Sequence, residues 1–194
     1  SYNEAITPFN LPPAARFGID TLFVMQQALE QETPLHQSLF PGATHSFPVN
    51  AMIGLAEEKQ VLNQVSQLID QGFTTLKCKV GQNFEKEHQL ITRLRESFPQ
   101  INLRIDANCS WSPQETLNNL NSLAALNIQY CEQPVPPHQW QELLDLGKSP
   151  SIPLAADESL DNVASIYRYT DHKLASFFII KPMRYGSIQE LQKA

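Results

Sequence analysis

The sequence lacks any run of lysines or arginines, and its acidic residues outnumber its basic ones. There are 20 Asp and Glu residues against 14 Lys and Arg, which gives a formal net charge of −6. Nucleic acids and anionic membrane surfaces are bound through clustered positive charge, so neither is an expected partner. By elimination, the charge balance favours a small-molecule partner.

Long hydrophobic runs are also missing. No apolar stretch approaches the roughly 18 to 20 residues that a membrane-spanning helix needs, and the N-terminus lacks the basic, apolar and small-residue segments of a signal peptide. The hydrophobic content of 42% is nevertheless within the ordinary range of folded globular proteins. We therefore expect a cytoplasmic protein with a sizeable core and no membrane segment.

Cysteine is scarce as well. The three cysteines, Cys78, Cys109 and Cys131, form no CxxC pair, which argues against a disulfide framework and against a zinc knuckle. Buried structural thiols are favoured over reactive or metal-bound ones. Neighbouring residues of a strand point to opposite faces, so Cys78 and Cys131 are expected to face covering helices, away from the polar residues next to them.

From Phe47 onward, short apolar runs alternate with longer amphipathic stretches. The runs are typical of buried parallel strands, and the stretches have the spacing of helices that cover a sheet. This alternation predicts an α/β fold with a parallel sheet. The last of three helices is expected to begin with Ser112 as its N-cap and Pro113 in its first turn. The expected strands are 47–53, 74–79, 102–106, 128–132, 152–156 and 177–180, and the expected helices between the first four are 57–71, 84–98 and 112–126.

A charged residue follows or closes each of the last five apolar runs. Successive residues are 27, 26, 25 and 24 positions apart, which is the length of one β/α unit. They are therefore expected at the same end of successive strands, the end that carries the active site in a β/α barrel. A single acid after a strand more often caps a helix or lies in solvent. Five charged residues at the same point of successive units favour a functional cluster, because gathering charges away from water is costly and is not expected without a function. The five residues are Lys79, Asp106, Glu132, Asp157 and Lys181.

The three acids of this series come from neighbouring strands. Asp106, Glu132 and Asp157 would form a hard, oxygen-rich site with a formal charge of −3. Such a site suits Mg²⁺ or a similar divalent cation and does not suit zinc, which prefers nitrogen and sulfur ligands. Magnesium would leave coordination positions open for the oxygen atoms of a substrate.

Lysines flank the predicted metal site. Lys77 and Lys79 are two residues apart and share one face of their strand, while Lys181 ends the strand after Asp157. A pair of strand lysines is by itself more typical of exposed residues, but its place beside the carboxylates favours catalysis. Removing the proton next to a carboxylate creates a dianionic enediolate that a metal ion stabilises. A lysine that acts as the base must be neutral, and a second ammonium group nearby lowers its pKa and so favours the neutral form. We therefore expect Lys79 to be the base and Lys77 to lower its pKa.

Five motifs resemble the muconate-lactonizing branch of the enolase superfamily: LKCKV, RIDANCSW, YCEQPV, AADESL and IIKP. The resemblance implies a TIM-type (β/α) barrel with an α+β capping domain. It implies Mg²⁺ on the three carboxylates, with Mn²⁺ as the alternative, and acid/base roles for Lys79 and Lys181, with Lys77 as electrostatic support. It also implies that Asn108 and Ser159 lie near the metal ligands or the substrate.

Within that branch, the segments RFGID, PVNAMIG and DANCSW resemble the o-succinylbenzoate synthases most. This resemblance implies a lyase that dehydrates a cyclohexadiene carboxylate in menaquinone or phylloquinone biosynthesis. Lys79 would then remove the proton and, as the conjugate acid, assist departure of the hydroxyl group from the same face of the substrate. Lys181 would stabilise the enediolate electrostatically. The alternative is an N-acyl amino acid racemase or dipeptide epimerase, in which the two lysines act on opposite faces. An inactive barrel fragment or scaffold is a third alternative, but it would have lost a catalytic position, and none of the five is lost.

The chain is expected to contain two parts. Residues 1–46 are expected to be the C-terminal part of the capping domain, with a helix at about 14–31, followed by a connector. Residues 47–194 are expected to form a partial catalytic barrel, with about six of the eight units of a TIM barrel. Six strands alone would leave unpaired sheet edges, so we expect the chain to be part of a longer polypeptide. Its predicted partner is a small carboxylate substrate, and formation of a homo-oligomer stays open.

Overall fold

The computed structural model describes residues 10–44, 46–54, 56–145 and 150–194. Residues 1–9 and His45, which belong to the predicted capping segment and connector, lie outside the described residues. The chain forms two compact units, each described here by itself. The first contains residues 1–47, 160–168 and 180–194, and the second contains residues 48–159 and 169–179.

The second unit is built on a parallel sheet of six strands in the order β1-β2-β3-β4-β5-β6. Each strand pairs with the next one along the chain, as successive β/α units require. The predicted α/β barrel class is therefore confirmed. The strands are β1 (Ala51–Ile53), β2 (Thr75–Lys79), β3 (Asn102–Asp106), β4 (Ile128–Glu132), β5 (Leu154–Ala156) and β6 (Phe177–Phe178).

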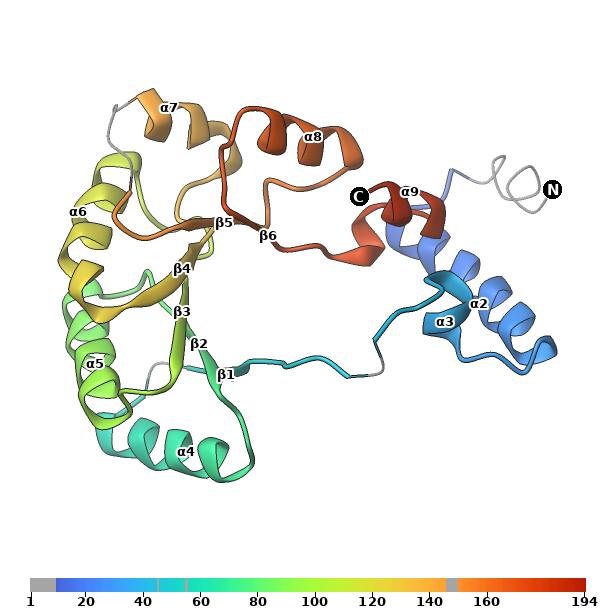
Figure 1. The fold of residues 1–194 in the computed structure, drawn as a ribbon. Helices are drawn as coiled ribbons and strands as arrows, with labels where there is room; N and C mark the ends of the chain where they lie inside the picture. Colours follow the sequence, from blue (N-terminus) through green and yellow to red (C-terminus); the bar gives the residue numbers. More distant parts are fainter. Residues whose placement is uncertain (1–9, 45, 55, 146–149) are drawn as a thin grey trace. The chain divides into compact units, whose positions relative to one another are not determined.

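Helices α4, α5 and α6 lie along one face of this sheet (Figure 1). Helix α6 begins as predicted: the Ser112 side chain accepts a hydrogen bond from the Glu115 backbone N–H, and the Glu115 carboxylate accepts one from the Ser112 N–H. This capping box satisfies two backbone N–H groups at the start of the helix. The helices between the strands are α4 (Glu58–Asp70), α5 (Phe84–Ser97), α6 (Pro113–Leu123), α7 (Trp140–Asp145) and α8 (Val163–Asp171), with short 3-10 turns η1 (Ala124–Leu126) and η2 (Pro137–Gln139).

Four strands are shorter than their apolar runs predicted, and β2 lacks only the first expected residue, Thr74. Strand β1 begins at Ala51, four residues later than expected, because Phe47 and Val49 are 71% and 57% exposed and bury no face. Strand β5 begins at Leu154, directly after Pro153, which has no N–H to donate to a sheet ladder. Strand β6 ends at Phe178, although the Ile179 N–H still donates to the Ala156 carbonyl oxygen.

The core of the second unit lies between the sheet and its helices. Leu103, Ile105 and Cys131 are fully buried on the helix side of β3 and β4, and Cys78 is 4% exposed. Burial raises the pKa of the Cys78 thiol to about 12. The expected burial of Cys78 and Cys131 is confirmed, and thiols held in their protonated form behave as small apolar side chains.

The first unit contains helices α2 (Pro13–Glu30) and α3 (Leu35–Leu39), residues 163–168 of α8, the 3-10 turn η3 (Pro182–Arg184) and helix α9 (Ile188–Lys193). The Asp20 carboxylate accepts a hydrogen bond of 2.6 Å from the Ile188 N–H, and the Gln192 amide donates to the Leu39 carbonyl oxygen. Residues 180–194 thus pack with the N-terminal segment, and the division into 1–46 and 47–194 stays a prediction. Among the described helices, none has the length and apolar character that crossing a membrane requires.

Candidate active site

The strand register brings the predicted site residues of the second unit to one edge of the sheet. Lys79 pairs with Asp106 across β2 and β3, and Asp106 pairs with Glu132 across β3 and β4. Asp157 follows the last residue of β5. The residues Asp106, Glu132 and Asp157 are only 3%, 2% and 2% exposed. Three buried acids therefore end three neighbouring strands.

Lys77 forms ion pairs with two of these acids. Its Nζ lies 2.9 Å from Asp106 Oδ2 and 2.7 Å from Glu132 Oε1. Burial lowers the pKa of Lys77, but the hydrogen bonds and negative charges of Glu132 and Asp106 together outweigh burial and raise it. Lys77 is therefore positively charged at neutral pH, and it balances one of the three negative charges.

The charge balance of the cluster is negative. Burial raises the pKa of Glu132; the hydrogen bond from Lys77 opposes this shift, and the negative charges of Asp106 and Asp157 add to it. Carboxylate oxygens with an excess of negative charge are the ligands that Mg²⁺ prefers, so the donor set fits a divalent cation. Within the described ranges, no three or more His, Cys, Asp and Glu side chains are positioned so that they could hold a metal ion as they stand. Lys77 Nζ is bonded to Asp106 Oδ2 and Glu132 Oε1, so it would compete with a cation for these two oxygen atoms.

Asn108 connects the predicted base to the carboxylates. The exposed Lys79 donates a hydrogen bond of 3.0 Å from Nζ to Asn108 Oδ1, and the Asn108 backbone N–H donates to Asp106 Oδ1 at 3.1 Å. The Asn108 side-chain amide lies 3.5 Å from Glu158 Oε1. Asn108 has a φ of 45°, a left-handed conformation that asparagine tolerates better than most residues. Sequence reasoning missed Glu158, although it lies in the AADESL motif directly after Asp157.

Gln133 is a second residue that sequence reasoning missed. It follows Glu132 in the YCEQPV motif and is fully buried. Its side-chain oxygen accepts hydrogen bonds from the backbone N–H groups of Asp157 and Ser159, and its Nε2 donates to Ser159 Oγ at 2.8 Å. Ser159, 4% exposed, thus directs its hydroxyl toward Gln133. The motif position next to a predicted ligand was the signal that could have found it.

Lys181 belongs to the first unit, where it precedes the 3-10 turn η3 with a φ of −102° and a ψ of 97°. Its side chain is partly exposed. Its role as the second lysine stays a prediction.

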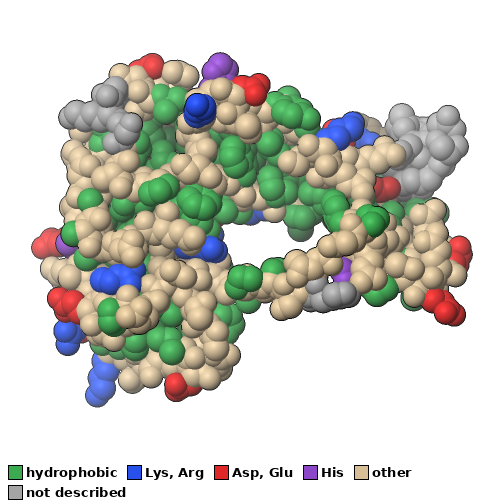
Figure 2. Space-filling model, in the orientation of Figure 1, with side chains coloured by type: hydrophobic (Ala, Val, Ile, Leu, Met, Phe, Trp, Pro, Cys, Tyr) green, Lys and Arg blue, Asp and Glu red, His purple; other side chains and the backbone are tan. Residues whose placement is uncertain are grey.

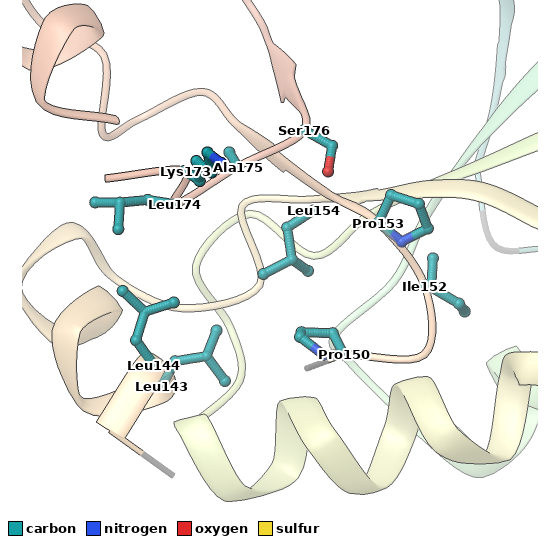
Figure 3. Close-up of a pocket in the computed structure, with 10 residues that line it drawn as sticks. All are labelled: Leu143, Leu144, Pro150, Ile152, Pro153, Leu154, Lys173, Leu174, Ala175 and Ser176. Carbon is teal, nitrogen blue, oxygen red and sulfur yellow. The ribbon is translucent and has the colours of Figure 1, made fainter. Parts of the chain in front are cut away.

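The cavity drawn in Figure 3 is separate from this cluster. Ile152, Pro153 and Leu154 line it at the beginning of β5, together with Leu143, Lys173 and Leu174, whereas Asp157 follows the other end of that strand. None of the described residues that line the cavity carries a carboxylate. On the face drawn in Figure 2, Lys and Arg side chains are spread out rather than gathered in one patch.

The geometry can be compared with known protein families. Residues 60–194 match the family model described as Enolase C-terminal domain-like. The chain belongs to the enolase superfamily. The match begins in α4 and includes the described strands β2 to β6, so the superfamily resemblance predicted from the five motifs is confirmed.

Relatives of this enolase-superfamily chain have two kinds of activity. It is 34% identical over 92% of its length to an o-succinylbenzoate synthase of Thermosynechococcus vestitus, of which it covers 53%. It is 27% identical over 93% of its length to an L-amino acid-D/L-Glu epimerase of Francisella philomiragia, of which it covers 51%. The chain therefore spans about half the length of these relatives. A crystal structure of the dipeptide epimerase from Enterococcus faecalis, complexed with Mg and the dipeptide L-Leu-L-Tyr, matches 98% of this chain with a TM-score of 0.86 and 25% identity, and the chain covers 54% of it.

Proposed function

We propose that this chain carries the catalytic centre of an enzyme that removes the proton next to a carboxylate group of a small substrate. The observation that carries the proposal is the strand register. It aligns Lys79 with Asp106 and Asp106 with Glu132, so a candidate base adjoins a cluster of buried acids. A divalent cation held by Asp106, Glu132 and Asp157 would supply positive charge to the enediolate dianion. Magnesium is the proposed metal, since the structurally similar Enterococcus enzyme is complexed with Mg.

The side chains around this cluster have distinct proposed tasks. Lys79 in its neutral form takes the proton, and the hydrogen bond to Asn108 orients its Nζ. Lys77 remains charged and adds positive potential beside the reacting carboxylate, because its ion pairs with Asp106 and Glu132 hold its proton. Lys181 is proposed as the second lysine, which acts as an acid/base group or as an electrostatic partner, depending on the reaction.

The proposed reaction is dehydration to o-succinylbenzoate, a step of menaquinone or phylloquinone biosynthesis. The synthase of Thermosynechococcus vestitus supports it, because its 34% identity exceeds the 27% of the Francisella epimerase. In this reaction Lys79 takes the proton and then returns it to the departing hydroxyl group on the same face. Mn²⁺ as an alternative metal, the cytoplasm as location and assembly into a homo-oligomer stay predictions.

The second candidate is an epimerase or racemase of dipeptides or N-acyl amino acids. The specific observation in its favour is the match of 98% of the chain to the epimerase structure from Enterococcus faecalis. This reaction needs Lys79 and Lys181 as an acid and a base on opposite faces of the substrate carbon. Both candidates share the proton-removal step and differ in the fate of the enediolate.

One experiment distinguishes the candidates. The full-length gene product is incubated in D₂O with Mg²⁺, once with the synthase substrate and once with a panel of dipeptides and N-succinyl amino acids. Dehydration without deuterium at the α-carbon of the amino acid compounds supports the synthase, and exchange without dehydration supports the epimerase or racemase. If neither reaction occurs while Mg²⁺ is bound, the proposed proton removal is contradicted for both substrate classes.

A further inference from the structure

Gln133 connects the ends of three strands through its backbone. Its carbonyl oxygen accepts a hydrogen bond of 2.7 Å from the Cys109 N–H in the loop after β3, and its N–H donates to the Ala155 carbonyl oxygen in β5 at 2.8 Å. Its φ of 37° lies in the left-handed region, where a long unbranched side chain is uncommon. A residue in such a conformation persists when the surrounding contacts determine it.

The Gln133 side chain uses its full hydrogen-bonding capacity. Oε1 accepts from the backbone N–H groups of Asp157 and Ser159 at 2.9 and 3.2 Å, and Nε2 donates to the Val135 carbonyl oxygen and to Ser159 Oγ, both at 2.8 Å. Backbone N–H groups only donate and a carbonyl oxygen only accepts, so these partners fix the orientation of the amide. Only a neutral carboxamide offers two donors and two acceptors in this geometry.

We propose that Gln133 is a positioning residue that holds the strand-end acids in the arrangement needed to bind the metal. Glu132 is its chain neighbour, the Asp157 backbone is bonded to its side chain, and the loop that follows Asp106 is bonded to its carbonyl oxygen. The inference rests on the proposed function, because it concerns the same metal site. Partners that orient metal ligands typically change metal affinity by about 10- to 100-fold when they are lost.

The test compares metal binding by the substrate-free, full-length gene product and by its Gln133→Met variant. Methionine has a similar length and volume but no group that can replace the four hydrogen bonds. Titration with Mn²⁺, followed by the electron paramagnetic resonance of the free ion, is expected to give a dissociation constant about 10- to 100-fold higher for the variant. The Mg²⁺ concentration that gives half-maximal activity should rise by a similar factor, and saturating Mg²⁺ should restore a large part of the activity.

Two further variants separate positioning from general stability. Leu120→Ala removes a fully buried side chain of α6 and should lower the melting temperature while Mn²⁺ affinity stays at the wild-type value. Ser159→Ala removes one of the four hydrogen-bond partners and should weaken Mn²⁺ binding less than Gln133→Met does. It keeps the glutamine and therefore remains informative if Gln133→Met fails to fold.

The outcomes distinguish the two levels of the hypothesis. If wild-type protein binds no divalent metal, the proposed function fails. If wild-type protein binds Mn²⁺ and the Gln133→Met variant binds it equally well, only the positioning role is overturned. The positioning role is also overturned if Leu120→Ala, at the same melting temperature as Gln133→Met, loses as much Mn²⁺ affinity. If Gln133→Met does not fold, unchanged Mn²⁺ affinity in Ser159→Ala overturns it.

Discussion

Replacing Lys77 with methionine should destabilise the metal-free protein and increase its response to Mg²⁺. The Lys77 side chain is 14% exposed and lies within 2.9 Å of Asp106 and 2.7 Å of Glu132, whose side chains are 4% and 2% exposed. The variant leaves both carboxylates buried without this ammonium. Removing one partner of a buried ion pair typically costs about 3–5 kcal/mol, and we expect a loss of this size in the free energy of unfolding at pH 7.5.

Urea denaturation with and without Mg²⁺ measures this effect. A ligand at a concentration of about 100 times its dissociation constant stabilises a folded protein by about 2.7 kcal/mol. The gain should be larger for Lys77→Met than for the wild type at equal Mg²⁺ concentration, because no ammonium competes with the ion for Asp106 and Glu132. The control is Lys86→Met, an exposed position in α5, which should change stability by less than about 0.5 kcal/mol. A loss for Lys77→Met as small as that of the control would refute the reasoning.

Three further predictions follow from burial and backbone geometry. Because the pKa of Glu132 is raised in the folded state, its protonated form favours folding, and this contribution is lost as the pH rises through that pKa; between about pH 5 and pH 8 the melting temperature of the metal-free protein should therefore fall more for the wild type than for Glu132→Gln, and an equal fall would contradict this. Gly81 has a φ of 110°, and a Cβ there would lie 1.8 Å from Ser110 Oγ, so Gly81→Ala should cost about 1–3 kcal/mol of stability. Adding Ser110→Gly to this variant should remove the clash with Ser110 Oγ but not the backbone strain, so thermal unfolding should show only a partial recovery of stability. Burial raises the pKa of the Cys78 and Cys109 thiols to about 12 and 11 and raises that of Cys131 well above its usual value; the thiolate is the reactive form, so Ellman's reagent at pH 8 should label the three slowly in native protein and rapidly in urea, and fast native labelling of Cys78 or Cys131 would contradict their burial.

The sequence predicted the regular part of the fold well. Strands β3 and β4 have the predicted bounds, and the N-cap of α6 is the predicted residue, Ser112. These features depend on local periodicity and on one side chain that caps a helix, so a short stretch of sequence contains the information. The start of β5 was wrong by two residues because the apolar run includes Pro153, which cannot donate a hydrogen bond to the sheet.

The contacts of the site were less predictable. Sequence spacing predicted a common strand end for Lys79, Asp106 and Glu132, and the register aligns them. It could not predict that Lys77 bonds to Glu132, 55 residues away, or that the Gln133 amide bonds to residues 24 and 26 positions later. Such contacts depend on side-chain rotamers and loop conformations that form only when neighbouring strands are assembled.

The most direct test of the proposed function is the rate of proton removal by Lys79→Ala at saturating Mg²⁺, measured on the substrate that the wild-type protein accepts. Lys86→Ala is the matched control, since it removes another exposed lysine of the same unit. A general base contributes about 10²- to 10⁴-fold to a rate, so Lys79→Ala should lose activity by that factor and keep its Mg²⁺ affinity, while Lys86→Ala stays at the wild-type rate. Proton removal by Lys79→Ala within a few-fold of the wild-type rate would contradict the central claim.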